Sequence, residues 1–239
     1  MKEIIKKFLH IASWDSGRGR DIKRVLGPFI RPDTTLLDGG CGEYGLALQL
    51  STVQVTGVDL IDSKVEKSNF EFRKGSILSL PFSDSSFSIA TSVDVLEHMP
   101  PEIRTQAIGE LIRVARSAIL LAFPCGTQAR KIDEDFAAEL TRFNKPEPEW
   151  LSEHLESPYP ELGAIFSVVE TEAKKHNKDV DIKIFYSERI QVSKMLRWVA
   201  ARSNKLFMLA NLFAGMVQPL ISRTNKDNSY RVILLAEFR

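Results

Sequence analysis

A glycine-rich segment that begins with an acid is the strongest candidate for a ligand-binding site in this sequence. The segment reads Asp38-Gly39-Gly40-Cys41-Gly42-Glu43-Tyr44-Gly45 and follows a short apolar run. Glycines in such a turn let a ligand approach the backbone closely and expose amide hydrogens at the start of a following helix. Gly40, Gly42 and Gly45 also fit the GxGxxG spacing of a dinucleotide site, which is a weak pattern on its own.

Two carboxylates narrow the choice of ligand. An acid directly before the glycines, as Asp38 is, would repel a pyrophosphate but attract a ligand that carries an ammonium or sulfonium charge. Asp59 ends the next apolar run, 17 residues after Gly42, where a carboxylate can accept both hydroxyls of a ribose. Because NAD sites use an acid in the same place, an NAD-dependent oxidoreductase remains the alternative to a cationic nucleoside ligand.

Polar residues follow two further apolar runs. Gly75-Ser76-Ile77-Leu78 ends one run, where a backbone amide and a short side-chain oxygen could face an adenine ring. Ser92-Val93-Asp94-Val95-Leu96-Glu97-His98 ends the other. A neutral imidazole can take a proton from a hydroxyl near pH 7, so His98 is a candidate general base. The plainer interpretation is that His98 packs at a helix start beside Glu97.

Strands and helices alternate among the elements that must position these residues. Short apolar runs predict strands at about 34–37, 53–59, 70–73, 87–92, 118–123, 182–186 and 231–238. Helical patterns lie at about 20–29, 44–50, 103–114 and 162–177, and two more, at 188–203 and 205–221, precede the last strand. Alternation of this kind predicts an α/β fold with a parallel sheet.

The motifs, in this order and spacing over about residues 30–125, resemble those of the class I S-adenosylmethionine-dependent methyltransferases, in the branch that acts on small molecules. The resemblance implies an enzyme with S-adenosylmethionine as cofactor and a Rossmann-like seven-stranded sheet, here with a helical insertion before the last strand. It implies one domain over 1–239, with a cofactor half at about 20–126, an acceptor half at about 127–228 and a closing strand at 229–239. The residues implied to bind the cofactor are Asp38, Gly39, Gly40, Gly42, Asp59, Leu60, Ser76, Ile77, Val93 and Asp94.

The second half should hold the methyl acceptor. The stretch from Pro148 to Leu155, PEWLSEHL, resembles a segment of methyltransferases from bacterial cell-surface glycan clusters. That resemblance favours a small-molecule or glycan hydroxyl, on a cell-surface sugar or a lipid-linked acceptor. Glu153, His154 and Tyr159 are then candidate acceptor contacts, with a polar helix end as the plainer interpretation. A quinone or other small aromatic is the alternative acceptor, and a non-catalytic relative would share the fold.

Composition argues against several other partners. The 239 residues are 44% hydrophobic and 26% charged, which is typical of a globular chain and not of a disordered one. Lys and Arg number 32 against 31 Asp and Glu, so no overall field favours nucleic acid. Cys41 and Cys125 lack the CxxC spacing of a zinc site and the four histidines are scattered, so we expect no metal.

The first residues and the most apolar segment indicate where in the cell the protein is expected. The first residues lack the apolar core and cleavage site of a secretory signal, so we expect a cytoplasmic protein. The segment 206–221 is shorter than the roughly 20 apolar residues that span a bilayer. Its apolar residues with basic edges fit a peripheral membrane contact through 205–221, a dimer surface or a lid over the sheet. The oligomeric state stays open.

Overall fold

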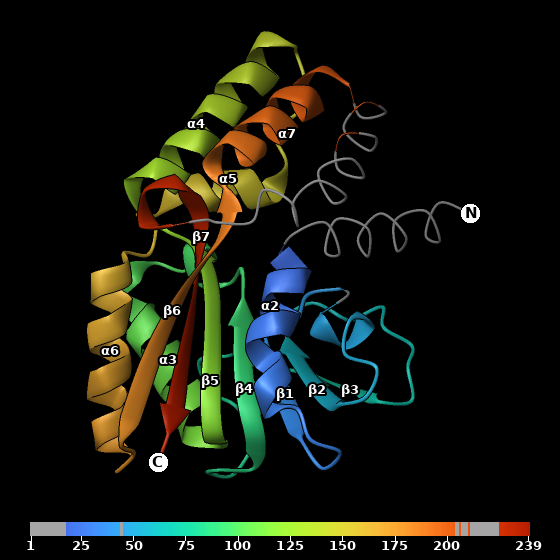
Figure 1. The fold of residues 1–239 in the computed structure, drawn as a ribbon. Coiled ribbons are helices and arrows are strands. Elements are labelled where there is room, and N and C mark those ends of the chain that lie inside the picture. The colour runs from blue at the N-terminus through green and yellow to red at the C-terminus, as the bar shows by residue number, and fades with distance from the viewer. Residues whose placement is uncertain (1–17, 44, 204–205, 207–209, 211–224) are drawn as a thin grey trace.

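A mixed sheet of seven strands forms the centre of the protein in this computed structural model (Figure 1). The structure describes residues 18–43, 45–203, 206, 210 and 225–239. The strands are β1 (Thr35–Gly39), β2 (Gln54–Asp59), β3 (Phe70–Lys74), β4 (Phe87–Val93), β5 (Ala115–Pro124), β6 (Val180–Arg189) and β7 (Ser229–Phe238). They lie in the order β3-β2-β1-β4-β5-β7-β6. Strand β7 is antiparallel to β5 and β6, and the other pairs are parallel.

The strand order reverses between β1 and β4, and this reversal determines where a ligand can bind. From β1 the chain goes outward through β2 to β3, and then returns to the other side of β1 as β4. In open α/β sheets the crevice at such a switch point, beyond the carboxyl ends of the strands, takes the ligand. Asp38 and Gly39 end β1, Asp59 ends β2 and Val93 ends β4. The predicted cofactor residues therefore meet at one edge.

Helices cover both faces of the sheet and its carboxyl edge. They are α2 (Arg18–Leu26), α3 (Pro101–Val114), α4 (Gly126–Arg142), α5 (Glu149–Glu156), α6 (Leu162–Lys175) and α7 (Ile190–Arg202). Figure 1 shows α3 and α6 against one face, α2 against the other, and α4, α5 and α7 as a cap beyond the carboxyl ends. Alternate residues of β5 enter the two core layers, Leu121 with α3 and α6 and Leu120 with α2, because successive strand side chains point to opposite faces.

The helix expected at 44–50 is wrong. Among the described residues the segment contains a single 3₁₀ turn, Leu46–Leu48. Gly45 takes φ +46° and ψ −176°, which no helix uses, and the Leu46 N–H donates to the side chain of Asp38. That amide is therefore satisfied by a carboxylate instead of by a ligand. In the glycine loop, the amides of Gly40 and Cys41 both donate to the carbonyl of Val58.

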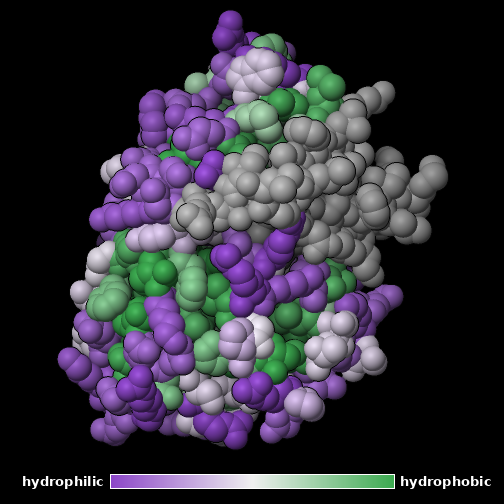
Figure 2. All heavy atoms as spheres, in the orientation of Figure 1, coloured by the Kyte–Doolittle hydropathy of each residue, from purple (hydrophilic) through white to green (hydrophobic). Residues whose placement is uncertain are grey.

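The second half joins the same sheet through β6 and β7. Helix α7 follows β6 and precedes β7 along the chain, where the sequence predicts the first helix of the insertion. The second helix, predicted at 205–221, lies outside the described residues apart from 206 and 210. The predicted membrane contact therefore falls mostly outside them as well. No helix in the described part of the chain combines the length and apolarity needed to cross a bilayer. Hydrophobic side chains reach the surface over the edge strand β6 and the neighbouring α6, beneath the cap (Figure 2).

Candidate active site

Asp38 holds the glycine loop from the core side. Its side chain is buried, with Oδ2 accepting the Leu46 N–H at 2.7 Å and Oδ1 accepting the Thr91 hydroxyl at 3.3 Å. Burial raises the pKa of Asp38 to about 6, against the lowering effect of these two hydrogen bonds. The carboxylate thus fixes the loop directly, and its charge acts on a cationic ligand from beneath the loop.

The raised pKa makes the stability of the protein depend on Asp38 between pH 4 and 6. The native state keeps a proton that the unfolded chain has lost above about 3.8, so the free energy of unfolding falls as pH rises from about 4 to 6. The difference corresponds to about 3 kcal/mol above pH 6. Asp38→Asn cannot ionise and should escape this loss. Urea unfolding of both proteins from pH 4 to 8 should show the variant gaining on the wild type up to pH 6, and a difference that is independent of pH would contradict the burial of this charge.

Two loop glycines have distinct roles. Gly40 has φ +75°, and a Cβ built there would lie 2.3 Å from Cγ2 of Val95, so the loop after β4 packs directly on it. Gly42 has φ +59°, and a Cβ built there meets nothing within 4 Å among the described residues. Gly40 is thus required for packing, whereas Gly42 keeps the open side of the loop free of a side chain, as close approach of a ligand requires.

Asp59 closes the other side of the loop. Its Oδ2 accepts the Gly42 N–H at 2.7 Å and its Oδ1 accepts the Ile61 N–H at 3.0 Å. A carboxylate has about four acceptor positions, so two remain for the hydroxyls of a ribose. Leu60 and Ile61 beside it are 69% and 53% exposed, an apolar surface that an adenine ring can cover. Glycine loop, acid and apolar surface together fit a nucleoside.

The remaining predicted cofactor residues contribute less through their side chains. Ile77 is buried against Gly39, and Val93 is buried in the core layer that also contains α2, so these two can offer only their backbones. The hydroxyl of Ser76 accepts the N–H of Leu78 at 3.2 Å. Asp94 has φ +56°, and its Oδ1 accepts Nη1 of Arg231 at 2.8 Å. Asp94 is thereby tied to β7.

His98 forms a pair with a carboxylate from the cap. Its Nδ1 lies 2.6 Å from Oε2 of Glu153 on α5, so Nδ1 carries the proton and Nε2 is the basic atom. Burial and the neighbouring His154 lower the pKa of His98, against the raising effect of Glu153. The His98 N–H also donates to the carbonyl of Val95, the residue that packs on Gly40. His98 is thus one turn from the glycine loop and is neutral near pH 7.

His154 and Tyr159, predicted as acceptor contacts, meet in a buried cluster around Asp133 of α4. Oδ2 of Asp133 lies 3.2 Å from Nδ1 of His154 and 2.5 Å from the hydroxyl of Tyr159. Tyr230 donates to the same oxygen and Arg197 to the other. Burial alone would raise the pKa of Asp133, but these partners hold it below its usual range. Tyr159 therefore directs its hydroxyl into the protein.

Sequence reasoning missed Asp133, Arg197 and Tyr230, although one signal was available. Asp133 falls on the apolar stripe of α4, with Ala129, Phe136 and Leu140 at helical spacing. A charge on such a stripe is buried with its helix, and buried charges need partners. The sequence could thus have predicted a buried acid, but not which side chains surround it.

Residues 37–123 match the family model described as a methyltransferase domain. Among curated proteins, the chain is 29% identical over 122 residues to 27-O-demethylrifamycin SV methyltransferase of Amycolatopsis mediterranei, covering 42% of this chain and 44% of the relative. It is 29% identical over 102 residues to demethylmenaquinone methyltransferase of Desulfitobacterium hafniense, covering 36% and 40%. The chain thus aligns with less than half the length of these two relatives.

Solved structures share the fold over nearly the whole chain. Magnesium protoporphyrin IX methyltransferase from Synechocystis, with S-adenosylhomocysteine bound, superposes with a TM-score of 0.56 at 14% identity, covering 99% of this chain and 85% of that one. The [4+2]-cyclase SpnF superposes with a TM-score of 0.57 at 15% identity, covering 91% and 79%. The match to a methyltransferase domain over residues 37–123 and the shared fold agree with the class I S-adenosylmethionine-dependent methyltransferases that the motifs resemble. The resemblance drawn from the sequence is thereby confirmed for the methyltransferase domain at residues 37–123 and for the fold.

Proposed function

We propose that the chain transfers a methyl group from S-adenosylmethionine to a hydroxyl of a small molecule. One observation supports the proposal: the loop that packs on Gly40 also carries His98, so the His98–Glu153 pair lies beside the loop proposed to bind the nucleoside. A reaction between a bound nucleoside donor and a hydroxyl needs both groups in one crevice. The relative that acts on 27-O-demethylrifamycin SV also supports an oxygen acceptor.

The residues divide the work between binding and proton removal. Gly42 and the apolar pair after Asp59 would hold the nucleoside part of the cofactor, and Asp59 would accept its ribose hydroxyls. S-adenosylmethionine supplies the methyl group on a sulfonium, which leaves as a neutral thioether. The protein's remaining tasks are to align the acceptor oxygen, exclude water and accept the hydroxyl proton. The proposal gives the last task to Nε2 of His98, the atom opposite the Nδ1 that pairs with Glu153 and 3.1 Å from Nε2 of His154.

A sugar or lipid-linked glycan is the first acceptor to test. This choice rests on the stretch Pro148–Leu155, whose helix α5 carries Glu153 into the site. Trp198 on α7 of the cap is 53% exposed and lies under the guanidinium of Arg202, 3.8 Å from the ring centroid. An exposed aromatic with a basic neighbour suits an acceptor held at a lipid surface. The demethylmenaquinone methyltransferase relative supports a quinone as the second candidate.

Ligand-induced thermal stabilisation, followed by turnover, tests the function. S-adenosylhomocysteine at about 100 times its dissociation constant should stabilise the protein by about 2.7 kcal/mol. For a chain of this size the melting temperature should rise by roughly 5 to 10 °C. NAD at the same concentration should leave it unchanged. Mass spectrometry of glycan, quinone and phenol acceptors incubated with the methyl donor should then show one added methyl group.

His98→Ala should separate chemistry from binding in that assay. Removal of a general base lowers turnover by about 10²- to 10⁴-fold, while the shift caused by S-adenosylhomocysteine should remain. Stabilisation by NAD alone would overturn the cofactor assignment and favour an oxidoreductase. Stabilisation by the nucleoside with no methyl transfer to any acceptor would favour a non-methylating relative. The [4+2]-cyclase SpnF shows that this fold also occurs in a protein named for a different reaction.

A further inference from the structure

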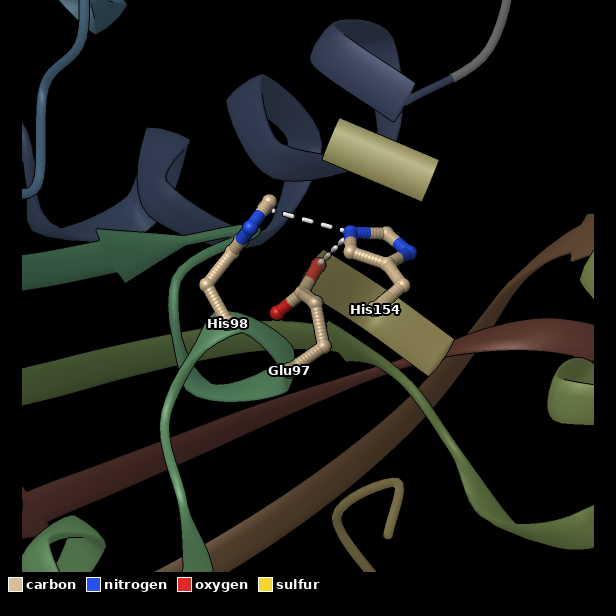
Figure 3. A group of neighbouring side chains, drawn as sticks. All are labelled: Glu97, His98 and His154. Carbon is tan, nitrogen blue, oxygen red and sulfur yellow. Dashed lines mark hydrogen bonds and ion pairs between the residues drawn. The ribbon is translucent and has the colours of Figure 1, made fainter. Parts of the chain in front are cut away.

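Two histidines and an acid converge at one point between the sheet edge and the cap. Figure 3 shows Glu97 and His98 after β4 and His154 from α5, with their polar ends turned toward one another. Nε2 of His98 lies 3.1 Å from Nε2 of His154, and Nε2 of His154 lies 3.8 Å from Oε1 of Glu97. One ligand atom from each of the three falls within 4.8 Å of the others. Glu97 is fully buried.

The two histidines turn their Nε2 atoms toward each other and their Nδ1 atoms toward carboxylates. Each Nδ1 faces a carboxylate, His98 that of Glu153 at 2.6 Å and His154 that of Asp133 at 3.2 Å. An ionised carboxylate only accepts hydrogen bonds, so each ring places its proton on Nδ1. Both Nε2 atoms then present lone pairs to each other at 3.1 Å, which is repulsive unless a proton or a metal ion lies between them.

We propose that Glu97, His98 and His154 bind one divalent transition-metal ion. Two ligand atoms at about 2.1 Å from a metal, at angles between 90° and 109°, lie about 3.0 to 3.4 Å apart. The nitrogen pair already has this separation, and the carboxylate oxygen of Glu97, at 3.8 Å from Nε2 of His154 and within 4.8 Å of His98, needs to move closer. Two histidines with one carboxylate form a common set in catalytic metal sites, which keep positions open for substrate.

The carboxylates that contact the Nδ1 atoms of the two histidines support the metal site. Metal-binding histidines almost always donate their second N–H to a carboxylate, carbonyl or water, which fixes the tautomer and raises the basicity of the ligand. Both histidines here have such a carboxylate, and Asp133 is held in turn by Arg197. Such support matters little for a surface histidine but is typical of a metal ligand.

The ligand set selects the class of ion. Imidazole nitrogens suit Zn²⁺, Fe²⁺, Co²⁺ and Ni²⁺, whereas Mg²⁺ and Ca²⁺ prefer sites made of oxygen. Binding of the ion does not depend on the proposed function, whereas a role for the ion in methyl transfer rests on it. A bound ion would be coordinated by Nε2 of His98, which would then no longer act as a base. The ion itself would lower the pKa of an acceptor hydroxyl bound to it.

Titration of tag-free protein with Zn²⁺, Co²⁺ and Mg²⁺ by calorimetry tests the site. We expect one Zn²⁺ or Co²⁺ per chain and much weaker binding of Mg²⁺. His98→Ala should weaken Zn²⁺ binding at least about tenfold, and Glu153→Gln, which keeps every ligand, by about 10- to 100-fold. Glu153 is 47% exposed, so this variant should fold. The Co²⁺ absorption spectrum should lack the intense band that a thiolate ligand would add.

His176→Ala is the matched control, because His176 lies at the end of α6, outside the cluster. Its Zn²⁺ affinity should equal that of the wild type. No saturable binding of Zn²⁺ or Co²⁺, or equal affinity in His98→Ala and the wild type, would overturn the proposal and leave a proton between the histidines. These readouts are independent of methyl transfer, so they stand whether or not an acceptor is found.

Discussion

Asp59→Ala should weaken the binding of S-adenosylhomocysteine by about 10²- to 10⁴-fold. The side chain makes hydrogen bonds to the backbone at Gly42 and Ile61, and the proposed ribose adds two more. Hydrogen bonds to a charged group contribute about 1.5 to 3 kcal/mol each, so losing the two to the ribose costs about 3 to 6 kcal/mol. Isothermal titration calorimetry measures the change directly.

Two control variants separate this effect from a general disturbance. Asp62→Ala removes a nearby acid that is 75% exposed and pairs with Lys74 at the surface, so it should bind the nucleoside as the wild type does. His98→Ala should also retain binding within a few-fold, because the role proposed for His98 lies with the acceptor and not with the nucleoside. If Asp59→Ala and His98→Ala lost equal affinity, the nucleoside would not lie at the glycine loop.

The arrangement of the proposed nucleoside site could be predicted because its parts are local in sequence. Asp38 and Gly42 lie within one turn, and Asp59 ends the strand next to theirs. The conformation of each part follows from residue type: glycine where φ is positive, an acid at a strand end. The error over the helix at 44–50 is local too: Gly45 has ψ −176°, and only one 3₁₀ turn, Leu46–Leu48, follows it. The spacing of apolar residues does not report a backbone conformation of this kind.

The acceptor half could not be predicted in the same way. His98, His154 and Asp133 come from three segments, and they meet only because the cap folds over the sheet edge. The histidines are scattered along the sequence, and on that ground we expect no metal. Their spacing in the sequence does not report the distance between their side chains in the folded protein. The orientation of Tyr159 is hidden from the sequence for the same reason, because its partner is on another helix.

Asp133→Ala should lower the free energy of unfolding by about 3 to 5 kcal/mol. The carboxylate is fully buried and accepts from Arg197 at 2.7 Å, and its loss leaves a largely buried guanidinium without its carboxylate. Breaking a buried pair by removing one partner costs about this much. Tyr159 and Tyr230 also lose their acceptor. The melting temperature should fall by roughly 6 to 20 °C, and urea unfolding should give the free energy.

Asp135→Ala provides the matched comparison, because Asp135 lies on the same helix and its pair with Lys131 is exposed. Exposed pairs contribute about 0 to 1 kcal/mol, so this variant should unfold almost as the wild type does. The double variant Asp133→Ala with Arg197→Met should recover part of the loss, since an apolar side chain then replaces the uncompensated charge. Equal urea midpoints for Asp133→Ala and Asp135→Ala would contradict a structural role for the cluster. A large loss at Asp133 alone would instead show that this carboxylate stabilises the packing of the cap, and with it His154, against β7.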